Sequence, residues 1–282
     1  MMTVENVERA IARLEAIDPA HEYAYENALL AYLTIKQLPT FIFQVPANME
    51  VFRARTSFDG EFFDSIQQIA LPPRELIKSF ARCNRPFQSK FYCAENRPTA
   101  YMELVEYWAQ NSAMDEQLCV TIGRWRVKRS FTTLLITSPF PEQRASAFDI
   151  EYGQVLDELL SDYQGEMLQA NIMIYDYLFK KFRKPAKNDP HTYLVTSAYC
   201  NLALARVPEE IDAIYYPSVP FGGQGVNFAF NSNFIKGENI ELIDAMRDEF
   251  TVYINEEEKK SFRQSRNQYT TNIDLQAGTI GW

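Results

Sequence analysis

The chain is poor in histidine, has no clustered cysteines and contains no long apolar run. Its only two histidines, His21 and His191, disfavour histidine-based catalytic triads and histidine-rich metal sites. The four cysteines show no C-x-x-C spacing, which argues against zinc and favours reduced core thiols. No segment approaches the roughly 20 apolar residues of a membrane span, and the N-terminus lacks a secretory signal pattern. We therefore expect a cytoplasmic protein without a metal site or membrane association.

Positive charge is also in short supply. The 28 Lys and Arg residues are outnumbered by 37 Asp and Glu residues, which gives a net charge of −9, and the basic residues are scattered. A nucleic-acid-binding protein needs a basic face to neutralise phosphates, so that class is disfavoured. What is abundant is apolar and aromatic side chains, at 46% and 14% of the chain, typical of an ordered globular protein. The length of 282 residues favours one domain with insertions.

The hydrophobic pattern predicts an α+β protein with three segments. Residues 1–45 form an N-terminal helical cover, in which Thr3 caps the first helix and the second extends from about Tyr23 to Lys36. Residues 46–255 form the core, with a helical insertion at 145–206. Residues 256–282 are a polar C-terminal extension, whose final residues are expected to be loosely ordered. In the second helix the side chains expected to face inward are Tyr25, Leu29, Tyr32 and Leu33.

Within the core, alternation of apolar and polar residues marks the strands, and three- to four-residue spacing marks the helices. Residues 58–76 are expected to be a poorly structured excursion. Strands are predicted at 49–56, 90–94, 117–127, 132–136, 211–216, 226–230 and 249–255, and helices at 148–163, 166–182 and 191–205.

The first core strand places Val51, Arg53 and Arg55 on one face. An unpaired buried arginine is costly, so this pattern requires partners for the two guanidinium groups. The alternative is an edge strand with both arginines in solvent.

We expect the chemistry in the stretch from Ala81 to Glu103. Its polar residues are Arg82, Tyr92 and Glu103. The strand at 90–94 carries Tyr92, and Thr99 is predicted to cap the following helix so that Glu103 projects from its first turn. The helix dipole favours an anion there. Taken singly, each residue has a simpler interpretation: Arg82 as a surface residue, Tyr92 as a core aromatic, and Glu103 on a solvated helix face.

Further along the chain, Ser218 follows Pro217 and precedes a glycine-rich loop. Ser218 alone would be interpreted as a turn residue. Gly222, Gly223 and Gly225 suggest a phosphate-binding loop, but no helix start or Lys-Ser/Thr pair follows them, so a P-loop is disfavoured.

Taken together, these motifs resemble the RES domain, a family named for its Arg, Glu and Ser, which correspond here to Arg82, Glu103 and Ser218. The resemblance covers about residues 49–230 in the correct order. The motifs that carry it are F-R-x-R at Phe52–Arg55, R-x-N-x-P from Arg82, FY-x-A around Tyr92, TA-x-x-E ending at Glu103, YPS at Tyr216–Ser218 and N-x-A at Asn227–Ala229. The chain departs from compact members in its N-terminal helices and in the long connection between Glu103 and Ser218.

The resemblance implies a split mixed sheet similar to the ADP-ribosyltransferase fold, and a protein that consumes NAD by breaking its nicotinamide N-glycosidic bond. Phosphate or water would be the acceptor, and no metal would be needed. Many relatives are toxins held in check by an antitoxin with a helix-turn-helix type domain, and a homodimer would be unsurprising. Two alternatives stay open: ADP-ribosyl transfer to a protein, and an NAD-binding module without catalysis.

The residue types suit this chemistry. Bond cleavage develops positive charge on the ribose, which a carboxylate such as Glu103 stabilises. The planar donors of Arg53 and Arg82 match the diphosphate. The resemblance further suggests that Tyr92 stacks on the nicotinamide and that Ser218 bonds its amide or the adjacent ribose. Asn227, in the N-x-A motif, is the remaining expected NAD-binding residue.

Overall fold

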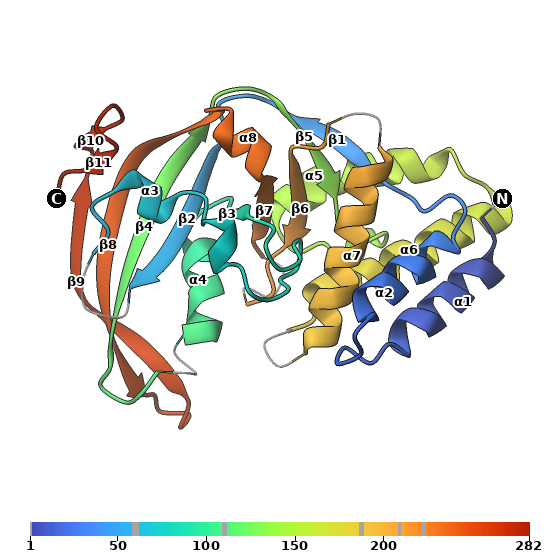
Figure 1. Cartoon of the computed structure of the whole chain (residues 1–282), viewed down its shortest axis with the longest axis horizontal. Coiled ribbons are helices and arrows are strands. Elements are labelled where there is room, and N and C mark those ends of the chain that lie inside the picture. Colours follow the sequence, from blue (N-terminus) through green and yellow to red (C-terminus); the bar gives the residue numbers. More distant parts are fainter. Residues whose placement is uncertain (1, 58–61, 109–111, 186–188, 208–209, 221–223) are drawn as a thin grey trace.

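The computed structural model describes residues 2–57, 62–108, 112–185, 189–207, 210–220 and 224–282. They form one mixed α+β structure built on a nine-stranded sheet, which confirms the predicted fold class (Figure 1). The strand order is β1-β5-β6-β7-β3-β2-β4-β8-β9. The strands are β1 (Ile42–Val45), β2 (Glu50–Ser57), β3 (Lys90–Ala94), β4 (Gln117–Val127), β5 (Phe131–Leu135), β6 (Ala213–Pro217), β7 (Val226–Asn231), β8 (Ile240–Ile254) and β9 (Lys260–Thr270).

Most of the helices are long, and α3 (Ile66–Ile69) and α8 (Ser232–Lys236) are short. The others are α1 (Val4–Glu15), α2 (Ala24–Leu33), α4 (Arg97–Trp108), α5 (Ala147–Ser161), α6 (Gly165–Arg183) and α7 (Pro190–Arg206). At one end of the molecule α1 and α2 pack against α6 and α7 (Figure 1). The N-terminal cover therefore lies on the helices predicted as an insertion. A two-stranded ribbon, β10 (Ile273–Asp274) and β11 (Thr279–Ile280), completes the chain.

The sheet is weakly joined in its middle. β2 pairs with β4 from Glu50 to Ser57, and β3 pairs with β7 from Lys90 to Ala94, but β2 and β3 meet only at the pair Phe52 and Ala94. The strands therefore separate on either side of that pair. β5 and β6 run parallel, and helices α5 to α7 make the long crossover that a parallel pair requires. The sheet is thus both mixed and split, as predicted; its likeness to the ADP-ribosyltransferase fold stays a prediction.

The start of α4 differs from the prediction. The helix begins at Arg97, and its first turn is capped by Asn96, whose Oδ1 accepts a hydrogen bond from the Thr99 backbone N–H at 2.8 Å. Thr99 is therefore inside the helix and is not its cap. Glu103 is the seventh residue of α4, in the second turn, where the dipole of the helix start is weaker than predicted. Asn96 is as good a capping residue as threonine, and it comes first.

Other expectations were wrong at the edges of the fold. Residues 58–76 were expected to lack structure, yet they contain α3, which begins with a capping box between Ser65 and Gln68. The final residues of the C-terminal extension were expected to be loosely ordered, but they form the paired strands β10 and β11. Leu33 is 43% exposed, because small residues and Tyr32 form the inner face of α2. The edge-strand alternative for β2 is wrong, since β2 lies between β3 and β4.

Among the described residues, no helix has the length and apolar content needed to cross a bilayer. The predicted boundaries of the three segments stay predictions, although β9 belongs to the same sheet as the core strands.

Candidate functional site

A cavity of about 260 Å³ opens where β2 and β3 separate. We call it the site cavity. Five of the residues predicted to act in NAD binding or catalysis line it, namely Arg53, Arg82, Tyr92, Glu103 and Asn227. The remaining wall is largely apolar and aromatic, and consists of Phe52, Ala54, Ala81, Cys93, Ala94, Ala100, Leu104, Tyr193 and Tyr216. Residues from β2, β3, α4, α7, β6 and β7 therefore meet in one place.

Glu103 is held by two donors that converge on one of its oxygens. The Ser218 hydroxyl donates to Glu103 Oε1 at 2.7 Å, and the Asn227 side-chain amide donates to the same atom at 2.6 Å. A carboxylate oxygen has two lone pairs, so both are used at Oε1. The carboxylate plane is fixed by these contacts, and Oε2 is the oxygen left for other partners.

Ser218 itself is fully buried and is not part of the cavity wall. The structure therefore places it behind Glu103. The predicted direct contact of its hydroxyl with nicotinamide or ribose is not the contact it makes here, since that hydroxyl donates to Glu103. Ser218 is brought to this position by β6, which ends at Pro217, and its backbone N–H donates to the Gly225 carbonyl at 2.7 Å.

The close approach of α4 to this turn explains why residue 225 is a glycine. A Cβ added to Gly225 would lie 2.1 Å from Thr99 Oγ1 and 3.0 Å from Thr99 Cβ. Distances this short require Thr99 or α4 to move. Gly225 thus lets the helix that carries Glu103 pack directly on the strand that carries Asn227. The predicted glycines at 222 and 223 lie outside the described residues.

Arg53 is buried at the split and is not in solvent. Its Nε donates to the Ile69 carbonyl at 3.1 Å, its Nη1 donates to the Tyr92 carbonyl at 2.7 Å, and its guanidinium lies 4.9 Å from the centre of the Phe91 ring. Burial lowers the pKa of Arg53 to about 10, so it is still protonated at neutral pH. Arg53 therefore connects β2 to β3 through a side chain where backbone pairing is missing.

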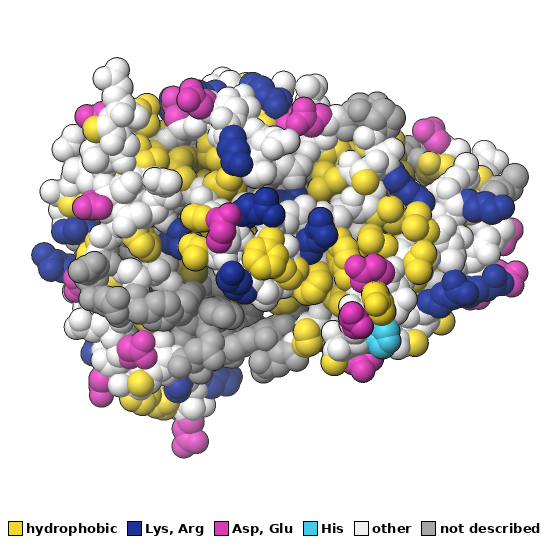
Figure 2. Space-filling view, in the orientation of Figure 1, with side chains coloured by type: hydrophobic (Ala, Val, Ile, Leu, Met, Phe, Trp, Pro, Cys, Tyr) yellow, Lys and Arg dark blue, Asp and Glu magenta, His cyan; other side chains and the backbone are white. Residues whose placement is uncertain are grey.

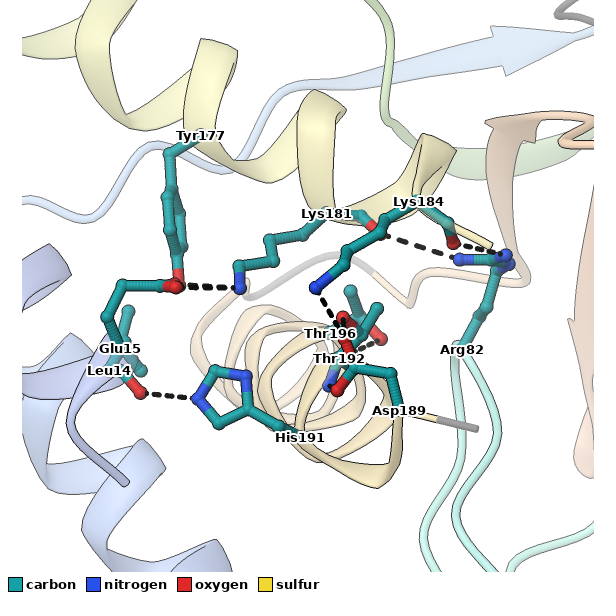
Figure 3. Close-up of polar contacts among 10 residues, drawn as sticks. All are labelled: Leu14, Glu15, Arg82, Tyr177, Lys181, Lys184, Asp189, His191, Thr192 and Thr196. Carbon is teal, nitrogen blue, oxygen red and sulfur yellow. Dashed lines mark hydrogen bonds and ion pairs between the residues drawn. The ribbon is translucent and has the colours of Figure 1, made fainter. Parts of the chain in front are cut away.

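Arg82 is held by the carboxyl end of α6 (Figure 3). Its Nη2 donates to the carbonyl of Lys184 at 3.0 Å, and its Nη1 approaches the carbonyl of Lys181 at 3.5 Å. These are carbonyls at the negative end of the helix, where a cation is favoured. The guanidinium also lies 5.5 Å from the Tyr193 ring centre. Through α6 this arrangement reaches the N-terminal cover, because Lys181 Nζ forms an ion pair with Glu15 at 2.8 Å.

Tyr92 uses its hydroxyl to hold the segment that contains Arg82. The hydroxyl donates to Asn84 Oδ1 at 2.7 Å and accepts from the Cys83 backbone N–H at 3.0 Å. Burial raises the pKa of the Tyr92 phenol well above its ordinary value, so it is a neutral donor. Asn84 was part of the R-x-N-x-P motif, but no structural role had been predicted for it.

Glu95 is a second carboxylate that the sequence did not single out. It follows β3, and its Oε1 accepts from the Val226 backbone N–H at 3.1 Å, while its own N–H donates to the Val226 carbonyl at 3.0 Å. Burial raises the pKa of Glu95 to about 7, against the lowering effect of the Val226 hydrogen bond. Tyr193 in the cavity wall was likewise missed, because nothing in its sequence context separates it from a core tyrosine. Tyr216 belonged to the YPS motif, but no role in the site had been predicted for it.

Comparison with known protein families gives a match over the part of the chain that contains the site cavity. A protein-family model described as RES domain matches residues 50–245 of the chain. No match was found among curated proteins. The matched range contains every residue that lines the site cavity, together with Ser218.

Proposed function

Since this chain belongs to the RES domain family, we propose that it degrades NAD by cleaving the bond between nicotinamide and ribose, with phosphate or water as the acceptor. The observation that carries the proposal is the Glu103 carboxylate, oriented by two donors at the wall of a cavity that two arginines also line. The same site is found within the range that the family model matches.

In the proposed reaction the bond between ribose C1′ and the nicotinamide nitrogen breaks, and its electron pair leaves with nicotinamide, which becomes neutral. The ribose carbon gains positive charge, and Glu103 Oε2 is the oxygen available to stabilise it. An oxygen of phosphate or water then bonds to C1′, and with water a proton is released. Ser218 and Asn227 contribute by fixing the carboxylate before the reaction, so that no reorganisation is needed when charge develops.

The walls of the cavity suit the nicotinamide end of the dinucleotide. At about 260 Å³ the cavity is near the lower end of ligand pockets, which span roughly 300–1,000 Å³. We therefore assign it to nicotinamide and its ribose. Three tyrosines, Tyr92, Tyr193 and Tyr216, offer aromatic surface for the ring. We assign the diphosphate to Arg82, whose half-buried guanidinium lines the cavity.

The test is Glu103→Gln. The neutral amide has the same shape but cannot stabilise a cationic ribose, so NAD loss is expected to fall by about a hundredfold or more. Products are identified by mass after incubation with NAD, with and without phosphate, which distinguishes ADP-ribose 1″-phosphate from ADP-ribose. The melting temperature should stay within a few degrees of that of the unaltered protein. Unchanged NAD loss in this variant would refute the proposal, and label transferred from NAD to a protein would assign the alternative transferase activity.

A further inference from the structure

A second hollow lies apart from the site cavity, on the segment that connects α3 to β3. It measures about 500 Å³ and shares no lining residue with the site cavity. We call it the Phe87 groove. Its walls are formed by Gln67, Leu71, Pro72, Pro73, Arg74, Glu75, Phe87, Gln88, Ser89, Ser232 and Lys236. Figure 2 shows hydrophobic side chains between Lys and Arg side chains in the middle of this face, over the segment between α3 and β3 in Figure 1.

Phe87 is held in an unfavourable backbone conformation with its ring exposed. Its φ is +61°, in the left-handed region that bulky residues rarely occupy, and 53% of its surface is accessible. Its backbone N–H donates to the Ile77 carbonyl at 2.8 Å, which fixes this conformation. Folding gains little from an exposed ring, so the strain at Phe87 is not explained by packing within this chain. Leu76, on the same segment, is 65% exposed.

The groove and its surroundings are positive although the chain is acidic. Arg74 and Lys236 line the groove, and Lys78 Nζ lies 5.0 Å from the centre of the Phe87 ring; Glu75 is the acidic residue of the lining. All four charged side chains are exposed, and within the described part of the chain none has an ion-pair partner. In a chain of net charge −9, these three cations give the groove a local excess of positive charge.

We propose that the Phe87 groove binds an extended acidic peptide segment of a partner protein that inserts an apolar side chain beside Phe87. The apolar wall of Leu71, Pro72, Pro73 and Phe87 accommodates that side chain, and the cations at its edge attract carboxylates. A nucleic acid would use the cations but not the prolines and the leucine. The proposal does not depend on the NAD-degrading activity.

The experiment starts from a random heptapeptide library selected against the full chain. Enriched peptides are expected to be acidic and to contain an aromatic or aliphatic residue. One such peptide, labelled with fluorescein, is then titrated by fluorescence anisotropy, and its affinity should weaken as salt is raised. Phe87→Gly should reduce the affinity at least tenfold without lowering the melting temperature, because glycine tolerates the positive φ.

A charge variant and its matched control separate the groove from the general charge of the protein. Arg74→Glu/Lys236→Glu should reduce the affinity about tenfold or more. Lys36→Glu/Lys128→Glu makes the same change of charge at exposed lysines outside the groove and should change it less than twofold. Enriched peptides without an acidic bias, or equal binding to the Phe87→Gly variant, would overturn the proposal. Binding of single-stranded DNA that does not depend on Phe87 would assign the surface to nucleic acid instead.

Discussion

At the scale of single residues, the site depends on one carboxylate oxygen with two donors. Glu103 Oε1 accepts from Ser218 and Asn227, and the distances of 2.7 and 2.6 Å are those of charge-assisted hydrogen bonds. Ser218 is buried behind the carboxylate, whereas Asn227 also lines the cavity. We therefore regard Ser218 as a positioning residue for Glu103, which differs from the contact with substrate that the family resemblance suggested.

This assignment predicts the kinetics of Ser218→Ala. With one donor removed, the carboxylate is less well fixed, and a hydrogen bond to a charged group contributes about 1.5–3 kcal/mol. We expect kcat for NAD degradation to fall about tenfold while KM changes less than twofold, because every 1.4 kcal/mol is a factor of ten. The measurement is steady-state kinetics of nicotinamide release.

Ser197→Ala is the matched control. Ser197 is also fully buried and donates to a backbone carbonyl, that of Leu194, within α7. The control should lose similar stability and keep its kcat. If Ser218→Ala raised KM and left kcat unchanged, a direct contact between Ser218 and the substrate would be the better explanation.

At the scale of secondary-structure elements, the contact between α4 and the turn before β7 sets the position of Glu103. The two elements touch through Thr99 and Gly225, and the Thr99 hydroxyl has no hydrogen-bond partner in the described part of the chain. A hydroxyl buried without a partner does not stabilise the protein. The contact therefore serves close packing.

Gly225→Ala should separate these two elements. Its new Cβ would overlap Thr99 Oγ1, so Thr99 or α4 must move. We expect a loss of about 1–3 kcal/mol in the free energy of unfolding together with reduced NAD turnover. Adding Thr99→Ala removes the two nearest atoms, Oγ1 and Cγ2, and leaves Cβ of residue 99 at 3.0 Å, so the double variant should recover most of both losses. Urea unfolding and turnover are measured for the two single variants and the double variant. Losses that simply add would contradict the proposed contact.

Glu95, at the junction of β3 and β7, is expected to make the stability of the protein depend on pH. Its pKa is raised from 4.5 to about 7 by burial, so the folded state binds a proton more tightly than the unfolded state. The stabilisation that the folded state gains by holding this proton on Glu95 is fully present below pH 4.5, and it is lost as the pH rises towards and through 7. Glu95→Gln removes this titration and can still accept the hydrogen bond from Val226.

We therefore expect Glu95→Gln to be more stable than the unaltered protein at pH 8, by about 1 kcal/mol after allowance for partial exposure, and to show a flatter stability profile between pH 5 and 8. Urea unfolding at several pH values measures this. Glu8→Gln, at an exposed position of α1, should leave the profile unchanged. A Glu95→Gln profile parallel to that of the unaltered protein would show that Glu95 does not titrate in this range.

At the scale of the whole molecule, the N-terminal cover and the site are joined through α6. Glu15 at the end of α1 pairs with Lys181, and the carbonyls at the end of α6 hold Arg82 (Figure 3). Leu14, which precedes Glu15 in α1, is fully buried, and its carbonyl oxygen lies 2.8 Å from Nε2 of His191 on α7. These contacts favour a single cooperative unit.

Leu14→Ala tests this view. Truncating a buried leucine costs about 2–5 kcal/mol, and if the cover is part of one unit the whole chain should become less stable by that amount in a single transition. Leu30→Ala is the control within the same cover, since Leu30 is 59% exposed and should change stability by about 0.5 kcal/mol or less. Unfolding is followed by both circular dichroism and tryptophan fluorescence. Two separate transitions would show that the cover unfolds independently.

Much of this architecture was predictable because it is local in the sequence. The strands Lys90–Ala94 and Gln117–Val127 have the predicted bounds, and α5 to α7 begin and end within a few residues of their predictions, since periodicity and flanking breakers act over short distances. The motifs around Arg82, Tyr92, Glu103 and Ser218 were sufficient to predict the family to which the chain belongs. Local prediction also has limits: α4 is capped by Asn96, because Asn96 and Thr99, three residues apart, are both capping residues and the first of them begins the helix.

The sequence by itself determined which segments become helices and strands, and which residue types are available for chemistry. Only the tertiary structure decided that Ser218, 115 positions after Glu103, donates to it, and that Arg82 meets carbonyls about a hundred positions away. It also decided that β2 and β3 separate and that Arg53 joins them. Such contacts depend on strand order and on the packing of α6 and α7, which arise from the burial of the whole chain and leave no local pattern.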